Sequence, residues 1–341
     1  MVTGARGFFG RYLVDTLLAL NAGPLADAPI QILALDSNMV ESGPPTDWLN
    51  RPNLTTYNHD VRHDLGNPML GGPPLTHVWH LAGIASPYWY QRLPEETIAV
   101  AVDGTRNMLG LAREHKARFL FTSSSEVYQT AEVVPTPETY VGAVPSLTGR
   151  SCYDVSKLMA ETLCYVEATK HGTHATVVRI FNSFGPGMGE HDRRILPRIA
   201  SAVVARRELR VFVDARQPLP RRTYTPVANT LLGFLLAAVK GESVGRSDRQ
   251  NVNSATGVYN VGLDSPELTV PELINRIAQS VRLDRIAYVL VPPPENYLTE
   301  PLRRCPDIKR LKTLGFLPCM DLDQGLELFF SWALSTYTGL E

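Results

Sequence analysis

The first half of the chain alternates short apolar segments with amphipathic ones, and this alternation constrains the fold more than any other feature. Apolar runs typical of buried strands occur at 31–36, 77–81, 118–122 and 175–181. Helical patterns lie between them, at 9–20, 94–115 and 152–171. Strands that alternate with helices form a parallel sheet whose two faces are both covered. The pattern therefore predicts an α/β fold built on a doubly wound parallel sheet.

A glycine-rich loop lies directly before the first helical pattern. Its glycines, Gly4, Gly7 and Gly10, have the spacing G-x-x-G-x-x-G. Glycines allow a tight turn and let a pyrophosphate approach the N–H groups at the positive end of a helix. Asp36 ends the next predicted strand, where its carboxylate can accept hydrogen bonds from both ribose hydroxyls. Because no Arg closely follows Asp36, the pattern predicts NAD rather than NADP, bound to a Rossmann-like sheet.

Two further segments are placed to meet the same cofactor. Asp60-Val61 would contact the adenine, and Leu81-Ala82-Gly83 would carry the chain past the cofactor. A glycine trio or one Asp by itself could equally be an ordinary turn or a helix cap, but their order together favours dinucleotide binding. The predicted cofactor-binding residues of this half are Gly4, Gly7, Phe8, Phe9, Gly10, Asp36, Asp60, Val61, Leu81, Ala82 and Gly83.

The strand before the glycine loop is short. Only residues 1–3 precede Gly4, whereas a central strand of a parallel sheet is normally longer. Either the start of the chain is placed downstream of the true one, or this strand is unusually short. The sequence leaves both interpretations open.

The second half of the chain is less regular than the first. Helical patterns occur at 196–206, 227–240, 270–281 and 322–337, and strand patterns at 258–261 and 287–291. At 341 residues the chain exceeds the usual size of a single domain. We expect residues 1–181 to form mainly the NAD-binding domain. Residues 182–341 would form mainly a smaller α/β substrate-binding lobe, with some segments returning to the sheet.

Tyr153 and Lys157 form the strongest catalytic signal. They stand at i and i+4 and so share one face of the predicted helix 152–171. A nearby ammonium lowers the pKa of a phenol, so we expect Tyr153 to take an alcohol proton near neutral pH. Ser124, which follows the strand 118–122, could hold the reacting oxygen. Y-x-x-x-K occurs by chance in many helices, but behind a glycine loop it predicts NAD-linked alcohol oxidation, with both residues also touching the cofactor.

The composition excludes several classes of protein. Hydrophobic residues make up 44% and charged residues 20% of the chain, and the net charge is −1. These values are typical of a globular protein and do not indicate a surface for nucleic acid or membrane. No apolar run approaches the roughly 18–20 residues of a membrane helix. The four cysteines lack metal-ligand spacing. We therefore expect a reduced, cytoplasmic protein without a metal.

Arginines occur in adjacent pairs at 193–194, 206–207, 221–222 and 303–304. In a nearly neutral chain such pairs fit a small anionic ligand better than a polymer. For any one pair, solvated surface charge is an equally good interpretation.

The motifs TGxxGFxG, HLAG, SSSEVY and YxxxK occur in this order, and they resemble the extended short-chain dehydrogenase/reductase family of nucleotide-sugar enzymes, the NAD-dependent epimerases and dehydratases. Within this family the chain most resembles the UDP-glucuronate decarboxylases. The similarity extends over nearly the whole length, through NHDV (58–61), A-S-P-x-x-Y (85–90), GTRNMLGLA (104–112), CYDVSK (152–157), RIFNSFGP (179–186) and R-x-P-D-I (304–308).

The resemblance implies roles for the matched positions. Ser124, Tyr153 and Lys157 would form the hydride-transfer triad. Ser125-Glu126 is the pair that the decarboxylases carry, whereas dehydratases acting on thymidine-linked glucose carry Asp-Glu. The implied catalytic residues are Ser124, Ser125, Glu126, Tyr153, Lys157 and Arg304. The implied substrate-binding residues are Tyr90, Glu126, Asn182, Arg194, Arg222, Tyr224 and Arg304, of which the last would handle the substrate's carboxylate.

The implied reaction is the NAD-dependent decarboxylation of UDP-glucuronate. Tyr153 would deprotonate the C4 hydroxyl while the C4 hydride passes to NAD. The resulting 4-ketone lies β to the C6 carboxylate and so favours loss of CO2. Glu126, Ser125 or a held water would assist the return of a proton at C5. Hydride return would give UDP-xylose, and earlier release would give a UDP-4-keto-pentose. The family also implies a homodimer packed through helices 94–115 and 152–171.

Two other hypotheses stay open. The first is a 4,6-dehydratase or 4-epimerase acting on another nucleotide sugar. Ser125 in place of Asp argues against the dehydratase, and Arg304 is unnecessary for an epimerase of neutral sugars. The second is an NAD-sensing regulator without activity. Such proteins commonly lack the Tyr or the Lys, and this chain has both.

The chain also departs from the family pattern. The family's GPR is Gly185-Pro186-Gly187, an expected Asn is Ala101, and Asn229 replaces an Asp. The loop 213–220, expected to contact the nucleotide, is longer than usual and rich in proline. These differences leave the base specificity and the exact substrate open.

Overall fold

The computed structural model describes residues 1–40, 46–65, 73–245, 255–293 and 301–340. Within these residues a seven-stranded sheet has the order β11-β6-β5-β4-β1-β2-β3, and all its neighbouring strands are parallel. The prediction of an α/β fold with a Rossmann-like, doubly wound parallel sheet is confirmed. The strands are β1 (Val2–Thr3), β2 (Ile32–Asp36), β3 (Leu54–Asn58), β4 (His77–His80), β5 (Arg118–Ser124), β6 (Ala175–Ile180) and β11 (Val258–Val261).

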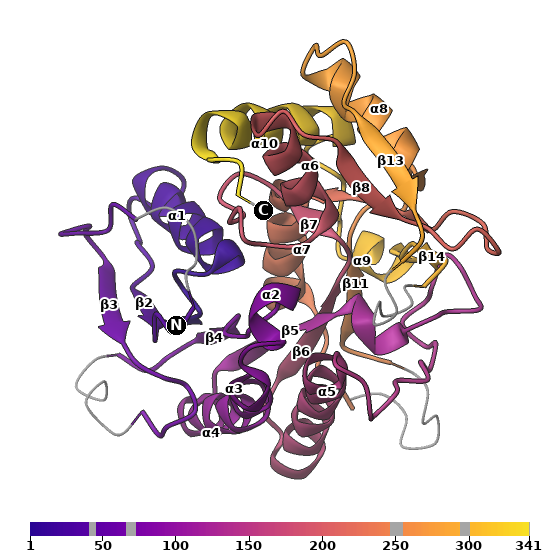
Figure 1. The fold of residues 1–341 in the computed structure, drawn as a ribbon. Coiled ribbons are helices and arrows are strands. Elements are labelled where there is room, and N and C mark those ends of the chain that lie inside the picture. The colour runs from indigo at the N-terminus through magenta and orange to yellow at the C-terminus, as the bar shows by residue number, and fades with distance from the viewer. Residues whose placement is uncertain (41–45, 66–72, 246–254, 294–300, 341) are drawn as a thin grey trace.

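Helices cover both faces of the sheet (Figure 1). On one face, α1 (Phe8–Ala22) and α7 (Val227–Lys240) bury Leu13 and Phe234 in an apolar cluster with Val178 of β6. On the other face, α4 (Thr105–His115) and α5 (Ser151–His171) bury apolar side chains in a cluster with Phe119 and Val177. Val177 and Val178, neighbours in β6, thus pack into clusters on opposite faces of the sheet, as the two-residue period of a strand requires.

The predicted helix 94–115 forms three continuous pieces rather than one α-helix. These are α3 (Pro94–Ala99), a π-helical turn η1 (Val100–Gly104) and α4. At Gly104 the backbone lies so close to Val61 that an added Cβ would stand 2.7 Å from Val61 Cγ2. Asn107 of α4 also donates a hydrogen bond to the carbonyl of Val61 at 2.9 Å. The widened turn therefore lies against the segment that follows β3.

One strand of the sheet is unusually short, and another comes from the second half of the chain. β1 has only two residues, yet it pairs with both β2 and β4 at the centre of the sheet. β11, from the second half of the chain, pairs with β6 at the sheet's edge. The polar stretch 241–257, whose composition predicts a loop, lies partly outside the described residues, which exclude 246–254.

A second layer of elements lies at the top of Figure 1, where α6 (Ile195–Val204), α8 (Val270–Ser280) and α10 (Leu322–Thr336) pack around β8 (Leu209–Phe212) and β13 (Tyr288–Val291). Capping boxes at Thr269 and Asp321 satisfy the first N–H groups of α8 and α10. The other elements are α2 (Pro87–Tyr90), η2 (Ser125–Tyr128), β7 (Ser183–Phe184), β9 (Arg221–Arg222), β10 (Thr225–Pro226), β12 (Leu268–Thr269), β14 (Arg303–Arg304) and α9 (Lys309–Thr313).

The predicted strand 287–291 corresponds to β13, which pairs in parallel with β8 rather than with the main sheet. The sequence pattern predicted the short strand β1 but not β3, β8 or the other two-residue strands. Among the described residues, no helix combines the length and apolar character that a membrane span requires.

Candidate active site

A cavity of about 500 Å³ lies along the carboxyl ends of the main strands and extends to α6, β8 and β14. Ligands of open parallel sheets bind at this edge. Side chains from both halves of the chain meet there. Every residue predicted for the cofactor, the substrate or catalysis lines this cavity: Gly4, Gly7, Phe8, Phe9, Gly10, Asp36, Asp60, Val61, Leu81, Ala82, Gly83, Tyr90, Ser124, Ser125, Glu126, Tyr153, Lys157, Asn182, Arg194, Arg222, Tyr224 and Arg304.

The glycine loop packs tightly against the chain that follows β4. Gly4 has a φ of +63°, and an added Cβ would stand 2.7 Å from the backbone of Ala82. Helix α1 begins after Gly7 without a side-chain cap and without an acidic residue in its first turn. Its first N–H groups are therefore left for an anion such as a pyrophosphate.

Asp36 is held in place at the end of β2. Its Oδ2 accepts a hydrogen bond from Arg6 N at 2.8 Å, and its Oδ1 accepts one from Asn38 N at 2.8 Å. Each carboxylate oxygen keeps a second lone pair that can accept a ribose hydroxyl. Asp60, by contrast, is bound by the Arg62 guanidinium at 2.7 and 2.9 Å. These two carboxylates fit the adenosine half of a dinucleotide.

Helix α5 and the end of β5 bring the predicted triad together. Lys157 Nζ donates a hydrogen bond to the carbonyl of Thr122 at 2.8 Å and lies 5.8 Å from the centre of the Tyr153 ring. Ser124 also acts on the Tyr153 phenol and lowers its pKa. Tyr90 of α2 stacks on Tyr153 with 5.4 Å between ring centres and 13° between ring planes. The phenol is therefore oriented from both sides.

Burial shifts the pKa values of both Tyr153 and Lys157. Burial raises the pKa of Tyr153 to about 12, against the lowering effect of Ser124. Burial also lowers the pKa of Lys157 to about 8. Desolvation of the phenolate is the largest of these effects on Tyr153, so the lower phenol pKa expected from Lys157 stays a prediction.

Glu126 lies between two guanidinium groups. Arg304 Nη2 donates to Glu126 Oε2 at 2.9 Å, and Arg304 Nη1 contacts Oε1. Arg150 Nη2 lies 2.6 Å from Oε2. Burial alone would raise the pKa of Glu126, but Arg304 and Arg150 lower it to about 2. Glu126 is therefore an anion at neutral pH.

Arg150 and Asp154 were not predicted from the sequence. Arg150 lies one helical turn before Tyr153, and its Nε is 3.7 Å from Asp154 Oδ2, which also accepts a hydrogen bond from Gln129 at 2.7 Å. Burial and the neighbouring Glu126 raise the pKa of Asp154 to about 6. The i−3 spacing of Arg150 from the predicted base was a usable signal.

Two arginines reach the cavity from paired strands. β9 and β14 are parallel, with Arg222 opposite Arg304 and Arg221 opposite Arg303. Arg222 and Arg304 are buried and line the cavity. On the other face, Arg303 binds Glu267 at 2.5 Å and Arg221 binds Glu272 at 3.1 Å. Of each arginine pair, one member faces the cavity and the other forms surface ion pairs.

The remaining two arginine pairs differ from each other. Arg193 and Arg194 both line the cavity, and Arg194 Nε binds both Asp192 oxygens at 2.9 and 3.0 Å. Arg207 instead donates to the carbonyl of Leu340 at 2.6 Å. The interpretation as a small-anion site thus fits three of the four pairs.

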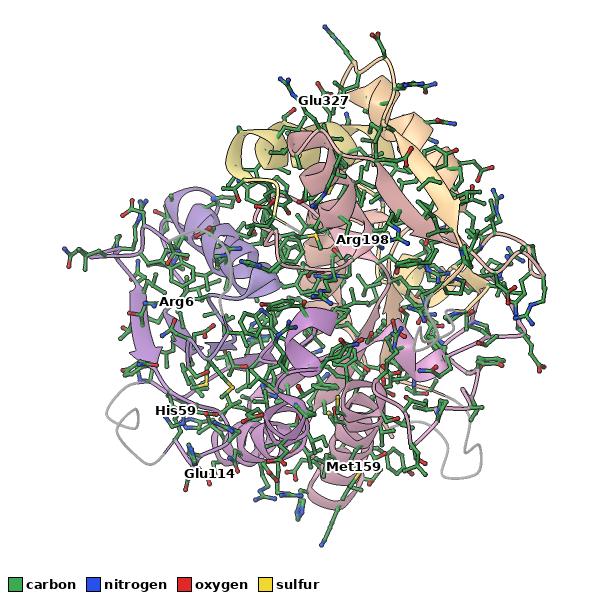
Figure 2. All side chains as sticks on the ribbon, viewed as in Figure 1. Arg6, His59, Glu114, Met159, Arg198 and Glu327 are labelled. Carbon is green, nitrogen blue, oxygen red and sulfur yellow. The ribbon has the colours of Figure 1, made fainter. Side chains whose placement is uncertain are left out.

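Three departures from the family pattern can be placed in the structure. The Arg11 guanidinium donates to the carbonyl of Gly187 at 2.9 Å and stands 2.9 Å from where a Cβ at residue 187 would be. Asn229 is buried, and its Oδ1 accepts a hydrogen bond from Cys319 N at 2.8 Å. The loop 213–220 directly follows Phe212. The guanidinium carbon of Arg198, which is labelled in Figure 2, lies 5.6 Å from the centre of the Phe212 ring. The cavity-lining residues of the loop are Val213, Asp214, Gln217, Pro218, Leu219 and Pro220.

Comparison with known proteins agrees with this geometry. The model of the NAD dependent epimerase/dehydratase family matches residues 1–262. The chain belongs to this family. The prediction of NAD as cofactor is thereby confirmed at the level of the family. A curated relative, UDP-glucuronic acid decarboxylase 6 of Arabidopsis thaliana, is 32% identical over 329 residues, which cover 96% of this chain and 86% of the relative.

Solved structures of the family share the fold. UDP-glucose 4-epimerase of Thermotoga maritima has a TM-score of 0.78 at 23% identity and covers 98% of both chains. UDP-glucuronic acid 4-epimerase of Bacillus cereus, solved with UDP-glucuronic acid and NAD, has a TM-score of 0.78 at 20% identity and covers 98% of this chain and 99% of its own. At these identities the likeness concerns the fold alone.

Proposed function

We propose that this family member decarboxylates UDP-glucuronate, with NAD as cofactor and oxidation at C4 as the first step. The single observation that carries the proposal is the placement of Arg304, buried in the cavity beside Glu126 and opposite Arg222 in the ladder of β9 and β14. A buried guanidinium in a ligand cavity is suited to a carboxylate or phosphate. The relative named UDP-glucuronic acid decarboxylase supports the same substrate.

Three groups of this chain would hold the cofactor in its half of the cavity. The uncapped N-terminus of α1 would bind the pyrophosphate, Asp36 the adenosine ribose, and Lys157 the nicotinamide ribose. NAD held there would supply the hydride acceptor for C4 of the sugar and a positive charge. A positive charge near Tyr153 would lower the pKa of the phenol, which burial raises to about 12.

Tyr153 and Ser124 would act on the C4 hydroxyl. Ser124 holds the oxygen through the hydroxyl that contacts Tyr153, and Tyr153 takes the proton. Lys157, anchored to the carbonyl of Thr122, stabilises the phenolate. The 4-ketone then stands β to the C6 carboxylate, so the electrons of the C5–C6 bond pass into the ketone as CO2 leaves.

Of the groups expected to assist the return of a proton at C5, Glu126 would act only as a hydrogen-bond acceptor. With its pKa lowered to about 2 by the two arginines, it accepts hydrogen bonds and does not itself supply a proton. Ser125 or a water held by Glu126 would deliver the proton to C5. Return of the hydride gives UDP-xylose, and release before that step gives the UDP-4-keto-pentose.

The decisive experiment follows CO2 release from UDP-glucuronate labelled at C6. The proposal predicts labelled CO2 and a UDP-pentose from the purified protein supplied with NAD. Formation of only the C4 epimer of UDP-glucuronate, without CO2, would assign the chain to the 4-epimerases. Turnover of UDP-glucose but not of UDP-glucuronate would equally contradict the proposal. Tyr153→Phe should lower kcat by about 100-fold or more while NAD affinity, measured by calorimetry, stays within about twofold.

A homodimer is part of the proposal. Exposed apolar side chains follow one face of α5 at helical spacing, and Ile98 of the neighbouring α3 adds to the same side of the molecule. Helices with such a face pack against another helix. The exposed apolar residues of α5 are Val155, Leu158, Met159, Tyr165 and Val166. All four cysteines are free, which supports a reducing, cytoplasmic compartment.

A further inference from the structure

Glu126 has two cationic partners that reach it from different elements. Arg304 comes from β14 and binds both carboxylate oxygens, whereas Arg150 immediately precedes α5 and lies 2.6 Å from Oε2. One bidentate guanidinium fills only two of the four acceptor sites of a carboxylate, so Glu126 can hold both arginines at once. Arg150 also lies near a second carboxylate, that of Asp154.

Arg150 is held in place independently of Arg304. Its carbonyl accepts hydrogen bonds from Tyr153 N at 2.9 Å and Asp154 N at 3.0 Å, so its backbone forms the first turn of the helix that carries the base. Its guanidinium also lies 3.7 Å from Asp154 Oδ2. Movement of Arg304 would leave these contacts intact.

A sugar carboxylate would be the third carboxylate in this group of charges. Glu126 and Asp154 are the anions, and Arg150 and Arg304 are their cations, with Arg222 adding to the potential. An acidic sugar that draws Arg304 to its C6 carboxylate leaves Arg150 as the remaining partner of Glu126. Without Arg150, Glu126 and the sugar carboxylate would both depend on Arg304 as their hydrogen-bonding partner, which favours proton uptake by one of them. The titratable and charged groups near Glu126 are Tyr90, Arg150, Tyr153, Asp154, Arg222 and Arg304.

We propose that Arg150 is a positioning residue that holds Glu126 ionised and in place while Arg304 is drawn to the carboxylate of the sugar. This inference rests on the proposed function, because it requires an acidic sugar in the cavity. It assigns the two arginines different tasks, with Arg304 moving to the substrate and Arg150 remaining on the protein.

The test compares the binding of UDP-glucuronate and UDP-glucose to the NADH-loaded protein by calorimetry near pH 6.5, in buffers of different ionisation enthalpy. Arg150→Met should weaken UDP-glucuronate about tenfold more than UDP-glucose, because only the acid draws on Arg304. It should also increase proton uptake on binding UDP-glucuronate, towards about one proton, since proton uptake by one carboxylate is then favoured. Arg150→Lys, which keeps the charge, should recover most of both effects.

The matched control is Arg113→Met, which removes an arginine that pairs with Glu167 near the far end of α5 and should change neither measurement. An equal loss of affinity for both sugars, or unchanged proton uptake, would show that Arg150 has only a structural role and would overturn the inference. Wild-type protein that binds UDP-glucuronate without releasing CO2 would overturn the proposed reaction but leave this test valid. Wild-type protein that binds only UDP-glucose would overturn both.

Discussion

Arg303 and Arg304 are neighbours in the chain but face opposite sides of β14. Arg304 is buried against Glu126, and Arg303 forms an exposed ion pair with Glu267. Because successive residues of a strand point to opposite faces, the two positions offer the same side chain in two environments. Substituting each arginine in turn therefore separates the loss of a group in the cavity from the loss of one positive charge at the surface.

We therefore expect Arg304→Met to lower kcat/KM for UDP-glucuronate by about 100-fold, since a buried partner of a carboxylate is worth about 2–5 kcal/mol. Arg303→Met should change it by less than about threefold, because exposed ion pairs contribute little. Steady-state kinetics of CO2 release measure both. Similar losses in the two variants would contradict a specific role for Arg304.

Glu126 should make the stability of the protein depend on pH in acid. Its pKa is about 2 in the folded protein and 4.5 in its ordinary environment, so its stabilising contribution is complete above about pH 4.5 and is lost as the pH falls towards 2. Glu126→Gln should cost about 3 kcal/mol at pH 7, because it leaves Arg150 and Arg304 without their carboxylate. This difference should shrink as the pH falls from 5 to 3.

Urea denaturation of the wild type and the variant across that range measures the effect. Glu114→Gln, at an exposed position of α4 labelled in Figure 2, serves as the control and should show no such difference. A Glu126→Gln variant as stable as the wild type at pH 7 would show that the two arginines do not depend on Glu126.

At the residue scale, the sequence predicted which side chains line the cavity but not how they are charged. Order and spacing along the chain were enough to place Tyr153, Lys157 and Ser124 together. The pKa of Tyr153 depends on how completely the surrounding elements exclude water, and the motif carries no information on that. Arg150 was missed because its partner Glu126 lies 24 positions earlier, and only the packing of η2 against α5 brings them together.

At the scale of elements, α5 presents one face to the cavity and an apolar face to the outside. Tyr153 and Lys157 point to the cavity, while Leu158, Met159 and Val166 are 39%, 45% and 44% exposed on the outside. Met159 is labelled on this helix in Figure 2. The proposed homodimer would bury the outer face, as expected for an apolar helix surface.

Leu158→Asp should therefore convert a dimer into a monomer, because it places a charge in the centre of an apolar interface. Light scattering coupled to size-exclusion chromatography measures the mass. Leu317→Asp, which changes an apolar side chain that is 77% exposed elsewhere on the surface, should leave the mass unchanged. A wild-type chain that elutes as a monomer at micromolar concentration would contradict the proposed dimer.

Elements with a regular pattern were predicted and elements without one were missed. The long helices α1, α5, α7 and α10 and the buried strands of the main sheet each carry enough periodic residues to be recognised. β9 and β14 have two residues each and form only because segments from distant parts of the chain pair. The π-helical turn at Val100–Gly104 reflects contact with Val61, which local periodicity does not contain.

At the scale of the whole molecule, the end of the chain supports the loop that carries Arg194. The Glu190 carboxylate accepts hydrogen bonds from the N–H groups of Thr338, Gly339 and Leu340, at 2.7–2.8 Å. Tyr337 donates to the carbonyl of Met188 at 2.8 Å. The segment after α10 thus fastens the loop between β7 and α6, which forms one wall of the cavity.

Glu190→Ala should lower the free energy of unfolding by about 1–3 kcal/mol, since it leaves several N–H groups without their charged acceptor. It should weaken UDP binding more than NAD binding, because the loop borders the substrate side. Calorimetry with each ligand and urea denaturation measure the two effects. Glu327→Ala, at an exposed position of α10 labelled in Figure 2, is the control. Equal loss for both ligands would contradict this local role.

The pairing of β9 with β14 has a consequence for how such a site withstands insertions and deletions. Both strands consist of two successive arginines, with Arg221 opposite Arg303 and Arg222 opposite Arg304. A shift of β14 by one residue that brings Arg303 to the place of Arg304 would still direct a guanidinium into the cavity. A one-residue change in the length of the chain before β14 can therefore leave the positive charge of the site in place.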